Sequence, residues 1–279
     1  MMKIIAMSDL HLSKKTWQVR KALKMADDAD LVLLAGDLVN DGVPEQFERM
    51  HQCISALLLK KPVLAVAGNH DYPRLPLPMI RNGICDYPAI QEWLLDSQPY
   101  PFTLDDSGAW AVQIGEVDIV GLNCVSHWRR FKFTDGAQLK WLEQYLNDSN
   151  TRWHIVMCHA PLLSHNPKRC DTKPYLSRDE KLQRIVDSHD NIIFISGHTH
   201  VSMESPGACV EHDTVRNNFY INGGSIRPTT LLQSDGKPEI HPADGNVVEL
   251  LLDTDGLTVT ALSLNTGKAI PGVQYHFSK

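Results

Sequence analysis

The sequence lacks a long apolar run, and this absence excludes a membrane-spanning protein. No stretch approaches the ~18 consecutive apolar residues that a helix across a bilayer requires. Near the N-terminus, the apolar residues 4–7 lead directly into Ser8 and Asp9, so they are too short for the apolar part of a signal peptide. We therefore expect a soluble, cytoplasmic protein with no membrane partner.

A basic excess and paired cysteines are also missing. The chain has 27 Lys and Arg against 33 Asp and Glu, a formal net charge of −6, and neither sign is clustered. This argues against a nucleic-acid partner, which usually requires a basic face. None of the six cysteines stands in a Cys-x-x-Cys pair, and several lie within apolar runs. A disulfide framework is therefore not expected, in keeping with a reducing compartment.

What the sequence does contain is a series of short, β-branched apolar runs. They occupy residues 4–7, 31–35, 63–67, 117–122, 155–158 and 192–196. Continuous rather than alternating apolarity predicts strands that are buried on both faces. Helical periodicity fills several of the intervals. It begins near Thr16 and at Pro44, and it recurs around residues 89–95, 139–146 and 182–186.

This alternation of strands and helices predicts an α/β protein with a layered architecture. Near the C-terminus the pattern changes, because two apolar runs flank a Gly-containing turn and predict a β-hairpin near 247–264. We expect residues 1–279 to form a single domain in which two mixed β-sheets pack face to face and helices flank them.

Two segments fit neither pattern. Residues 72–102 contain six prolines, and residues 162–177 are polar with two further prolines. Long irregular insertions in a compact domain are often lids or substrate-contacting loops, although plain surface loops have the same composition. We interpret both as lid-like insertions.

Polar residues that can bind metals follow five of the predicted strands, at the point where each strand ends. They are Asp9 and His11, Asp37, Asn69 with His70 and Asp71, His159, and His198 with His200. Ligand sites of layered α/β proteins form at the carboxyl ends of strands. Oxygen and imidazole ligands without thiolates suit Zn, Mn and Fe(II) rather than a structural zinc knot.

Each motif has a simpler explanation when it is taken alone. Asp9-x-His11 is compatible with a surface turn or a helix cap, and Gly36-Asp37 with an ordinary turn. The repetition at five strand ends favours a metal centre instead. His127 and His165 also follow strand ends, but surface positions are favoured for both. Phosphate contacts from Arg74 and Arg227 are a hypothesis, and surface charges explain them equally well.

The five blocks resemble the calcineurin-like metallophosphoesterase superfamily. They are Asp9-x-His11, Gly36-Asp37-(x)4-Gly42, Gly68-Asn69-His70-Asp71, Cys158-His159-Ala160-Pro161 and Gly197-His198-Thr199-His200. All occur in the order typical of the family. The short N-terminal block and the overall size look most similar to the bacterial cyclic-nucleotide and glycerophosphodiester phosphodiesterase branch. The resemblance implies a four-layer αββα sandwich, in agreement with the strand and helix pattern.

The resemblance also implies two divalent metal ions (Fe, Mn or Zn) and a role for each residue. Asp9, His11 and His200 would hold the first ion, and Asn69, His159 and His198 the second. Asp37 would bridge the two ions. His70 would contact the phosphate or the leaving-group oxygen without binding a metal, and Asp71 would orient His70.

These roles describe a phosphodiesterase for a small phosphoester, either a cyclic nucleotide or a glycerophosphodiester, in which a metal-bound hydroxide attacks phosphorus. A phosphomonoesterase or nucleotidase would share every ligand and differ only in the insertions. A non-catalytic protein-binding scaffold is a third alternative, although the complete ligand set argues against it. Assembly into an oligomer through the C-terminal hairpin is compatible with the sequence.

Overall fold

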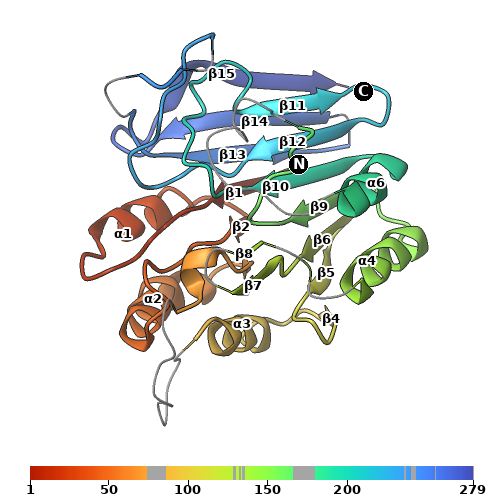
Figure 1. Ribbon diagram of the computed structural model, residues 1–279, viewed down its shortest axis with the longest axis horizontal. Coiled ribbons are helices and arrows are strands. Elements are labelled where there is room, and N and C mark those ends of the chain that lie inside the picture. The colour runs from red at the N-terminus through yellow and green to blue at the C-terminus, as the bar shows by residue number, and fades with distance from the viewer. Residues whose placement is uncertain are drawn as a thin grey trace.

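Two mixed β-sheets lie face to face, and helices cover their outer faces (Figure 1). The computed structural model describes residues 1–73, 86–127, 130–131, 133, 136–165, 180–235, 237–239, 243–254 and 256–278. The four-layer αββα sandwich implied by the sequence is therefore confirmed.

The first sheet joins the two ends of the chain. Its six strands follow the order β15-β14-β13-β1-β2-β3. They are β1 (Met2–Met7), β2 (Leu31–Leu34), β3 (Val63–Ala65), β13 (Asn246–Leu252), β14 (Gly256–Ser263) and β15 (Ala269–Ser278). Strands β1, β2 and β3 are parallel, whereas β13, β14 and β15 add antiparallel neighbours. The predicted hairpin is confirmed, with Leu252 opposite Leu257.

The second sheet has seven strands in the order β11-β12-β10-β9-β6-β5-β4. They are β4 (Thr103–Leu104), β5 (Trp110–Ile114), β6 (Val117–Gly121), β9 (Trp153–Met157), β10 (Ile192–Ser196), β11 (Val210–Asp213) and β12 (Asn218–Asn222). Its central strands β6, β9, β10 and β12 are parallel, so their carboxyl ends meet at one edge. A separate ribbon pairs β7 (Val125–His127) with β8 (Arg130–Phe131).

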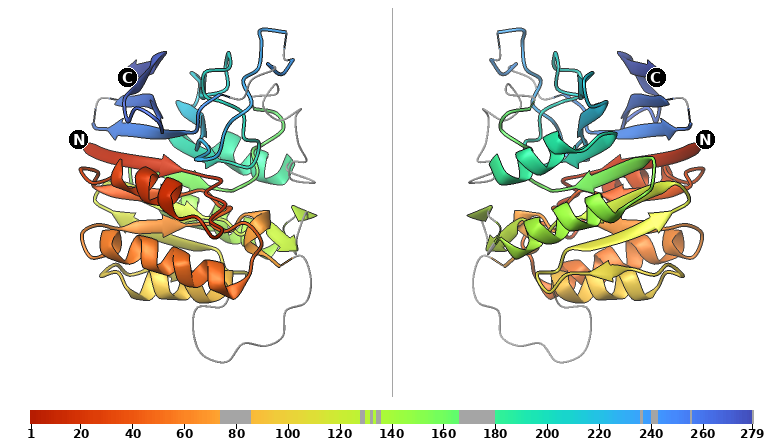
Figure 2. Two further views of the ribbon diagram at one scale, coloured as in Figure 1. Left: turned by 90° about the vertical axis from the view of Figure 1, so that its left-hand side faces the viewer. Right: turned by 90° about the vertical axis from the view of Figure 1, so that its right-hand side faces the viewer.

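Helices cover the two outer faces, as the opposite views of Figure 2 show. The first sheet packs against α1 (Trp17–Lys24), α2 (Pro44–Leu58) and α3 (Tyr87–Asp96), and the second against α4 (Ala137–Asp148) and α6 (Glu180–Ser188). Helix α2 begins at Pro44, as predicted. Helix α1 ends earlier than its apolar pattern, and Ala26 and Ala29 reach the same core from turns.

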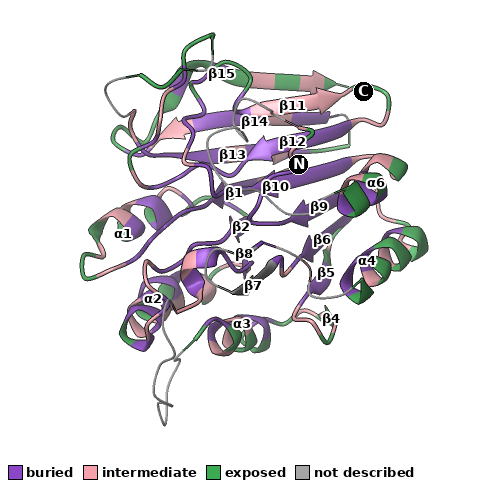
Figure 3. Cartoon of the chain, viewed as in Figure 1, coloured by how far each residue is buried: buried purple, intermediate pink, exposed green. Residues whose placement is uncertain are grey.

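Burial explains why the strands read as continuous apolar runs. Along β1, Ile4 and Ala6 face the core between the sheets, whereas Ile5 and Met7 face α1 and α2. Side chains alternate across a strand, so a strand covered on both sides needs apolar residues at every position. Figure 3 shows these strands buried and the outer faces of the helices exposed.

Several elements had no clear sequence signal, namely β4, β5, β11, β12 and β15. The first predicted insertion contains α3 in the place of the 89–95 pattern, but its residues 74–85 lie outside the described part of the chain. The same holds for 166–177 of the second insertion. Among the described residues, no helix has both the length and the apolarity needed to cross a membrane.

Candidate metal centre

The predicted ligands meet where the carboxyl ends of strands from both sheets converge. Asp9 follows β1 and Asp37 follows β2 in the first sheet, whereas His159 follows β9 and His198 follows β10 in the second. Backbone hydrogen bonds join these loops, from Asp9 N to Gly36 O at 3.0 Å and from Gly197 N to His159 O at 2.9 Å. The convergence depends on the two sheets facing each other.

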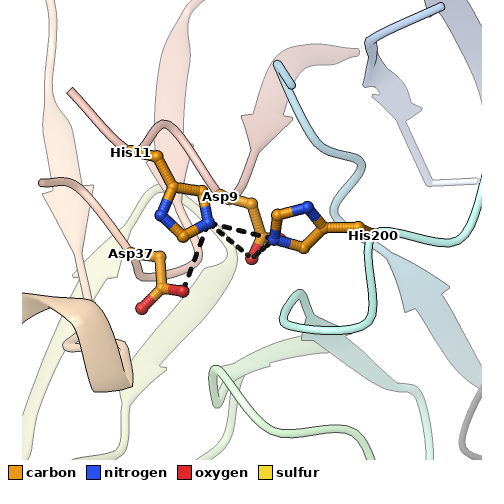
Figure 4. Close-up of side chains that lie close together, drawn as sticks. All are labelled: Asp9, His11, Asp37 and His200. Atoms are coloured by element: carbon orange, nitrogen blue, oxygen red, sulfur yellow. Dashed lines mark hydrogen bonds and ion pairs between the residues drawn. The ribbon is translucent and has the colours of Figure 1, made fainter. Parts of the chain in front are cut away.

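Two overlapping groups of side chains could each hold a cation. The first contains Asp9, His11, Asp37 and His200 (Figure 4), and the second contains Asp37, His159 and His198. Within each group the ligand atoms lie within 4.8 Å of one another. His200 Nε2 is 3.1 Å from Asp9 Oδ1, and both His11 Nε2 and His159 Nε2 approach Asp37 Oδ2, at 3.5 and 3.4 Å. Asp37 is the residue that the two groups share.

The backbone of this centre is strained. Five residues have left-handed φ values: 52° at Asp9, 42° at His11, 53° at Asp37, 70° at His198 and 54° at His200. This conformation costs a residue with a side chain roughly 1–2 kcal/mol. Strain of this kind persists only where the surrounding structure enforces it, and it is concentrated at functional sites.

Glycines allow the close approach of the loops. A Cβ atom at Gly68 would lie 2.2 Å from the Asp37 backbone nitrogen, and one at Gly197 would lie 1.7 Å from Ser8 Oγ. Both contacts are far shorter than any tolerated carbon contact, so these positions require glycine.

The two buried carboxylates of the cluster need a positively charged partner. Asp9 and Asp37 are buried, with relative exposures of 0% and 1%. Burial alone would lower the pKa of His159, but the Asp37 and Asp9 carboxylates outweigh it and raise that pKa to about 10. For His11, burial dominates and lowers the pKa to about 4. In the metal-free centre, a proton on His159 therefore offsets part of the charge that a divalent ion would neutralise.

The donor set fits divalent cations. Asn69 Oδ1 is buried and has no hydrogen-bond partner in the described part of the chain. A buried polar atom of this kind is costly unless a ligand or ion satisfies it. His159 donates its Nδ1–H to Ala35 O at 2.7 Å, which turns Nε2 towards Asp37. Such a bond from the remote ring nitrogen is typical of metal-ligating histidines.

His70 and Asp71 lie beside the cluster with separate contacts. The His70 ring meets the His11 ring edge-on, with centroids 4.5 Å apart, and donates Nδ1–H to Asn40 O at 2.6 Å. Asp71 instead accepts hydrogen bonds from the backbone of Val39 and Gly68, at 2.9 and 2.8 Å. We expected Asp71 to orient His70. The Asn40 carbonyl accepts the hydrogen bond from the His70 ring, and the Asp71 carboxylate connects the two loops that carry Val39 and Gly68.

Asp71 also has a raised pKa. Burial and the nearby Asp37 carboxylate raise the Asp71 pKa to about 8, against the opposing effect of the two backbone donors. Both of its oxygens are used within the protein. Asp71 is therefore placed to shape the loops rather than to face a substrate.

Other candidates fall in different places. His165 stacks on Tyr220, with ring centroids 3.3 Å apart, and contacts Glu211 at 2.9 Å. Arg74 and the His127 side chain lie outside the described residues. Phe131 was not anticipated, although its ring packs against His198 with centroids 4.5 Å apart. It stands in a stretch without regular apolar spacing, so no sequence pattern marked it.

Comparison with known proteins identifies the family. Residues 2–202 match the model of the calcineurin-like phosphoesterases, and the chain belongs to this family. This stretch contains all seven predicted metal ligands together with His70 and Asp71.

Similar curated proteins are bacterial phosphodiesterases. The chain is 29% identical over 174 residues to a probable cyclic nucleotide phosphodiesterase of Synechococcus, covering 61% of this chain and 58% of that protein. It is 27% identical over 172 residues to a glycerophosphodiester phosphodiesterase of Enterobacter lignolyticus, covering 61% of this chain and 56% of the relative. The chain thus spans somewhat more than half the length of these relatives.

A solved structure supports the fold. Purple acid phosphatase from yellow lupin seeds superposes with a TM-score of 0.66 at 12% identity, covering 99% of this chain and 53% of that protein. At this identity the similarity concerns the arrangement of strands and helices only.

Proposed function

We propose that the protein is a phosphodiesterase that uses two divalent metal ions and acts on a small substrate, either a cyclic nucleotide or a glycerophosphodiester. The observation that carries the proposal is the pair of overlapping ligand groups that share Asp37. Asp9, His11 and His200 would hold the first ion, and Asn69, His159 and His198 would hold the second. Family membership and the named activities of the bacterial relatives support this assignment.

The protein residues would divide the work of hydrolysis. Two bound cations supply Lewis acidity and activate water near neutral pH. Asp37 would contribute to both metal sites, because its carboxylate belongs to both ligand groups. His70 protonates the leaving-group oxygen through Nε2, since its Nδ1–H is already committed to Asn40 O. Asp71 holds the loops that carry Asp37 and His70 in register through Val39 and Gly68.

We further propose that residues 1–279 act as one domain. The core between the sheets includes residues from Ile4 to Val273, so the C-terminal strands share it with the N-terminal ones. The insertions near 72–102 and 162–177 would select the substrate. A cytoplasmic location stays a prediction, and fractionation of cells that express the tagged protein would test it.

A phosphoester panel tests the activity. Protein loaded with Mn²⁺, Zn²⁺ or Fe²⁺ is assayed on bis-p-nitrophenyl phosphate and on p-nitrophenyl phosphate, followed by cyclic nucleotides and glycerophosphodiesters. Elemental analysis of the same samples counts the bound metal. We expect two ions per chain and a higher kcat/KM for the diester.

Other outcomes point to the alternatives. Preference for the monoester would indicate a phosphomonoesterase or nucleotidase with the same ligands. Two bound metals without turnover of any ester would favour a binding role. Retention of less than one metal ion under all loading conditions would overturn the dinuclear centre itself.

A further inference from the structure

Residues 223–230, a segment outside the family match, contact the backbone of the loops that carry the first ligand group. The match ends at residue 202, so this segment belongs to the C-terminal part of the chain. It hydrogen-bonds the backbone beside Asp9, His11, His198 and His200. Gly223 N donates to Ser196 O at 2.7 Å, and Ile226 N donates to Ser8 O at 3.3 Å.

Two further contacts reach the ligand residues themselves. Arg227 Nη2 donates to the main-chain oxygen of His11 at 2.9 Å. Thr230 N donates to the main-chain oxygen of His200 at 2.7 Å. His11 and His200 are the two imidazoles of the first ligand group, and their Nε2 atoms lie 3.0 Å apart. Each therefore has its carbonyl held from the same C-terminal segment.

These carbonyl contacts matter because both histidines have left-handed backbones, with φ of 42° at His11 and 54° at His200. A non-glycine residue would relax to a right-handed conformation if nothing opposed it. Relaxation rotates the peptide plane and moves both the carbonyl oxygen and the imidazole. A donor fixed on the carbonyl opposes that rotation, so Arg227 and Thr230 hold the rings at the positions from which they face Asp9 and Asp37.

The segment is itself well anchored. Ser225 pairs with Asn246 at the start of β13, with Asn246 N donating to Ser225 O at 2.8 Å. Thr229 pairs with Ala243 through two backbone bonds of 3.0 and 2.8 Å. The Arg227 guanidinium has a second acceptor, because its Nη1 donates to Gln18 Oε1 at 3.4 Å near the start of α1. The backbone of the segment and the Arg227 guanidinium are therefore both held in place, so Arg227 can restrict the position of the His11 carbonyl.

The geometry points to Arg227 as a positioning residue for the first metal site, the site of Asp9, His11, Asp37 and His200. This inference rests on the proposed dinuclear centre and adds a residue that the family match does not include. It also gives Arg227 a different task from the phosphate contact considered in the sequence, because its guanidinium is turned to the His11 carbonyl.

Calorimetric titration of the metal-free protein with Mn²⁺ tests this role without substrate. We expect wild type to bind two ions. In Arg227→Ala, one dissociation constant should rise about tenfold, the lower end of the range for partners that orient metal ligands. The other constant should stay unchanged, as should the unfolding temperature of the metal-free protein. Arg227→Lys keeps a donor and should restore most of the affinity.

Arg216→Ala is the matched control. Arg216 forms an ion pair with Asp190 at 3.1 Å, and its main-chain oxygen accepts from Asn191 just before β10, at the opposite end of that strand from His198. Its loss should leave both Mn²⁺ constants unchanged. If Arg227→Ala does not fold, Gln18→Leu decides the question, because it frees one side of the guanidinium. We expect the same constant to rise by a smaller factor.

Several results would overturn the positioning role. Equal weakening of both constants, or a lower unfolding temperature of metal-free Arg227→Ala, would make Arg227 a general structural residue. Unchanged constants with only a higher KM for a diester would make it a substrate contact. Unchanged constants in Gln18→Leu, where that variant decides, would also count against it. Wild type that binds two Mn²⁺ ions yet hydrolyses no phosphoester would refute the proposed function and leave the positioning role intact.

Discussion

The Nε2 atoms of His11 and His200 lie 3.0 Å apart, although 189 positions separate the residues in the sequence. The pair forms because β1 and β10 belong to facing sheets and end at the same edge. Burial lowers the His11 pKa to about 4 despite the Asp37 and Asp9 carboxylates, so this imidazole is neutral near pH 7. A neutral ring is the form that ligates a metal.

Removal of the shared carboxylate should affect both metals at once. Asp37 takes part in both ligand groups, and its oxygens approach His11, His159 and the His70 backbone nitrogen. We expect Asp37→Ala to reduce bound metal from about two ions to less than one and to abolish turnover, because a dinuclear site acts through both ions. Elemental analysis after desalting measures the loss. Full occupancy of either site in this variant would contradict the bridging role.

Loss of the His70 imidazole should separate turnover from metal binding. The ring lies against His11, while its Nδ1–H is held by Asn40 O. His70→Ala should lower kcat for a diester by about 10²–10⁴-fold, the usual contribution of a general acid. Metal content should stay at the wild-type level, as elemental analysis of the assayed sample would show. Coincident loss of metal would instead make His70 a ligand.

Features of the fold and the site that depend on neighbouring residues in the sequence could be predicted, whereas those that depend on distant segments could not. Strands such as β1 and β10 are buried on both faces, so their apolar runs mark them directly. Short motifs of carboxylates and imidazoles at the ends of these strands then indicated ligands, because ligand sites of layered α/β proteins form at the carboxyl ends of strands. The structure brings Asp37 close to His159 and His198, whereas their roles as metal ligands stay a prediction.

Other features could not be predicted, because they depend on contacts between distant segments. Strand β15 contains Pro271 and Gly272, and only four of its ten residues have a strong apolar or aromatic character, so the β pattern is weak. Phe131 contacts His198 from the two-residue strand β8, and Arg227 contacts the His11 carbonyl from a loop. Neither stretch of sequence has a regular apolar spacing. The hydrogen bonds of Asp71 likewise became evident only when Val39 and Gly68 were seen beside it.

Another buried carboxylate, remote from the metal centre, should make the stability of the fold depend on pH. Asp118 accepts hydrogen bonds from Ser149 and Thr151 and lies 3.3 Å from His154 Nδ1. Burial alone would raise the Asp118 pKa, but these partners outweigh it and hold the pKa below its ordinary value. A carboxylate with a depressed folded-state pKa stabilises the fold above its unfolded pKa, and the effect is lost as pH falls through the folded value.

Asp118→Asn should therefore lower the free energy of unfolding at pH 7 by about 1.5–3 kcal/mol, as expected for lost charged hydrogen bonds. The difference from wild type should persist down to roughly pH 4 and shrink below it, as the wild-type carboxylate takes up a proton. Urea unfolding at several pH values measures both quantities. A difference that stays constant below pH 3 would show that the stabilisation does not depend on the charge of Asp118.

A single methyl group at Gly68 should disrupt the metal centre. The added Cβ would lie 2.2 Å from Asp37 N and equally close to Asp37 Oδ1, so Asp37 must move in Gly68→Ala. Since Asp37 belongs to both ligand groups, we expect loss of both metals and of activity. Gly136→Ala is the control, because its nearest contact would be Lys181 Nζ at 3.9 Å. Circular dichroism establishes that each variant folds, and elemental analysis reads the metal. A folded Gly68→Ala protein that binds two metal ions would show that the loop can yield without displacing Asp37, and the close packing of Gly68 would then not be a requirement of the site.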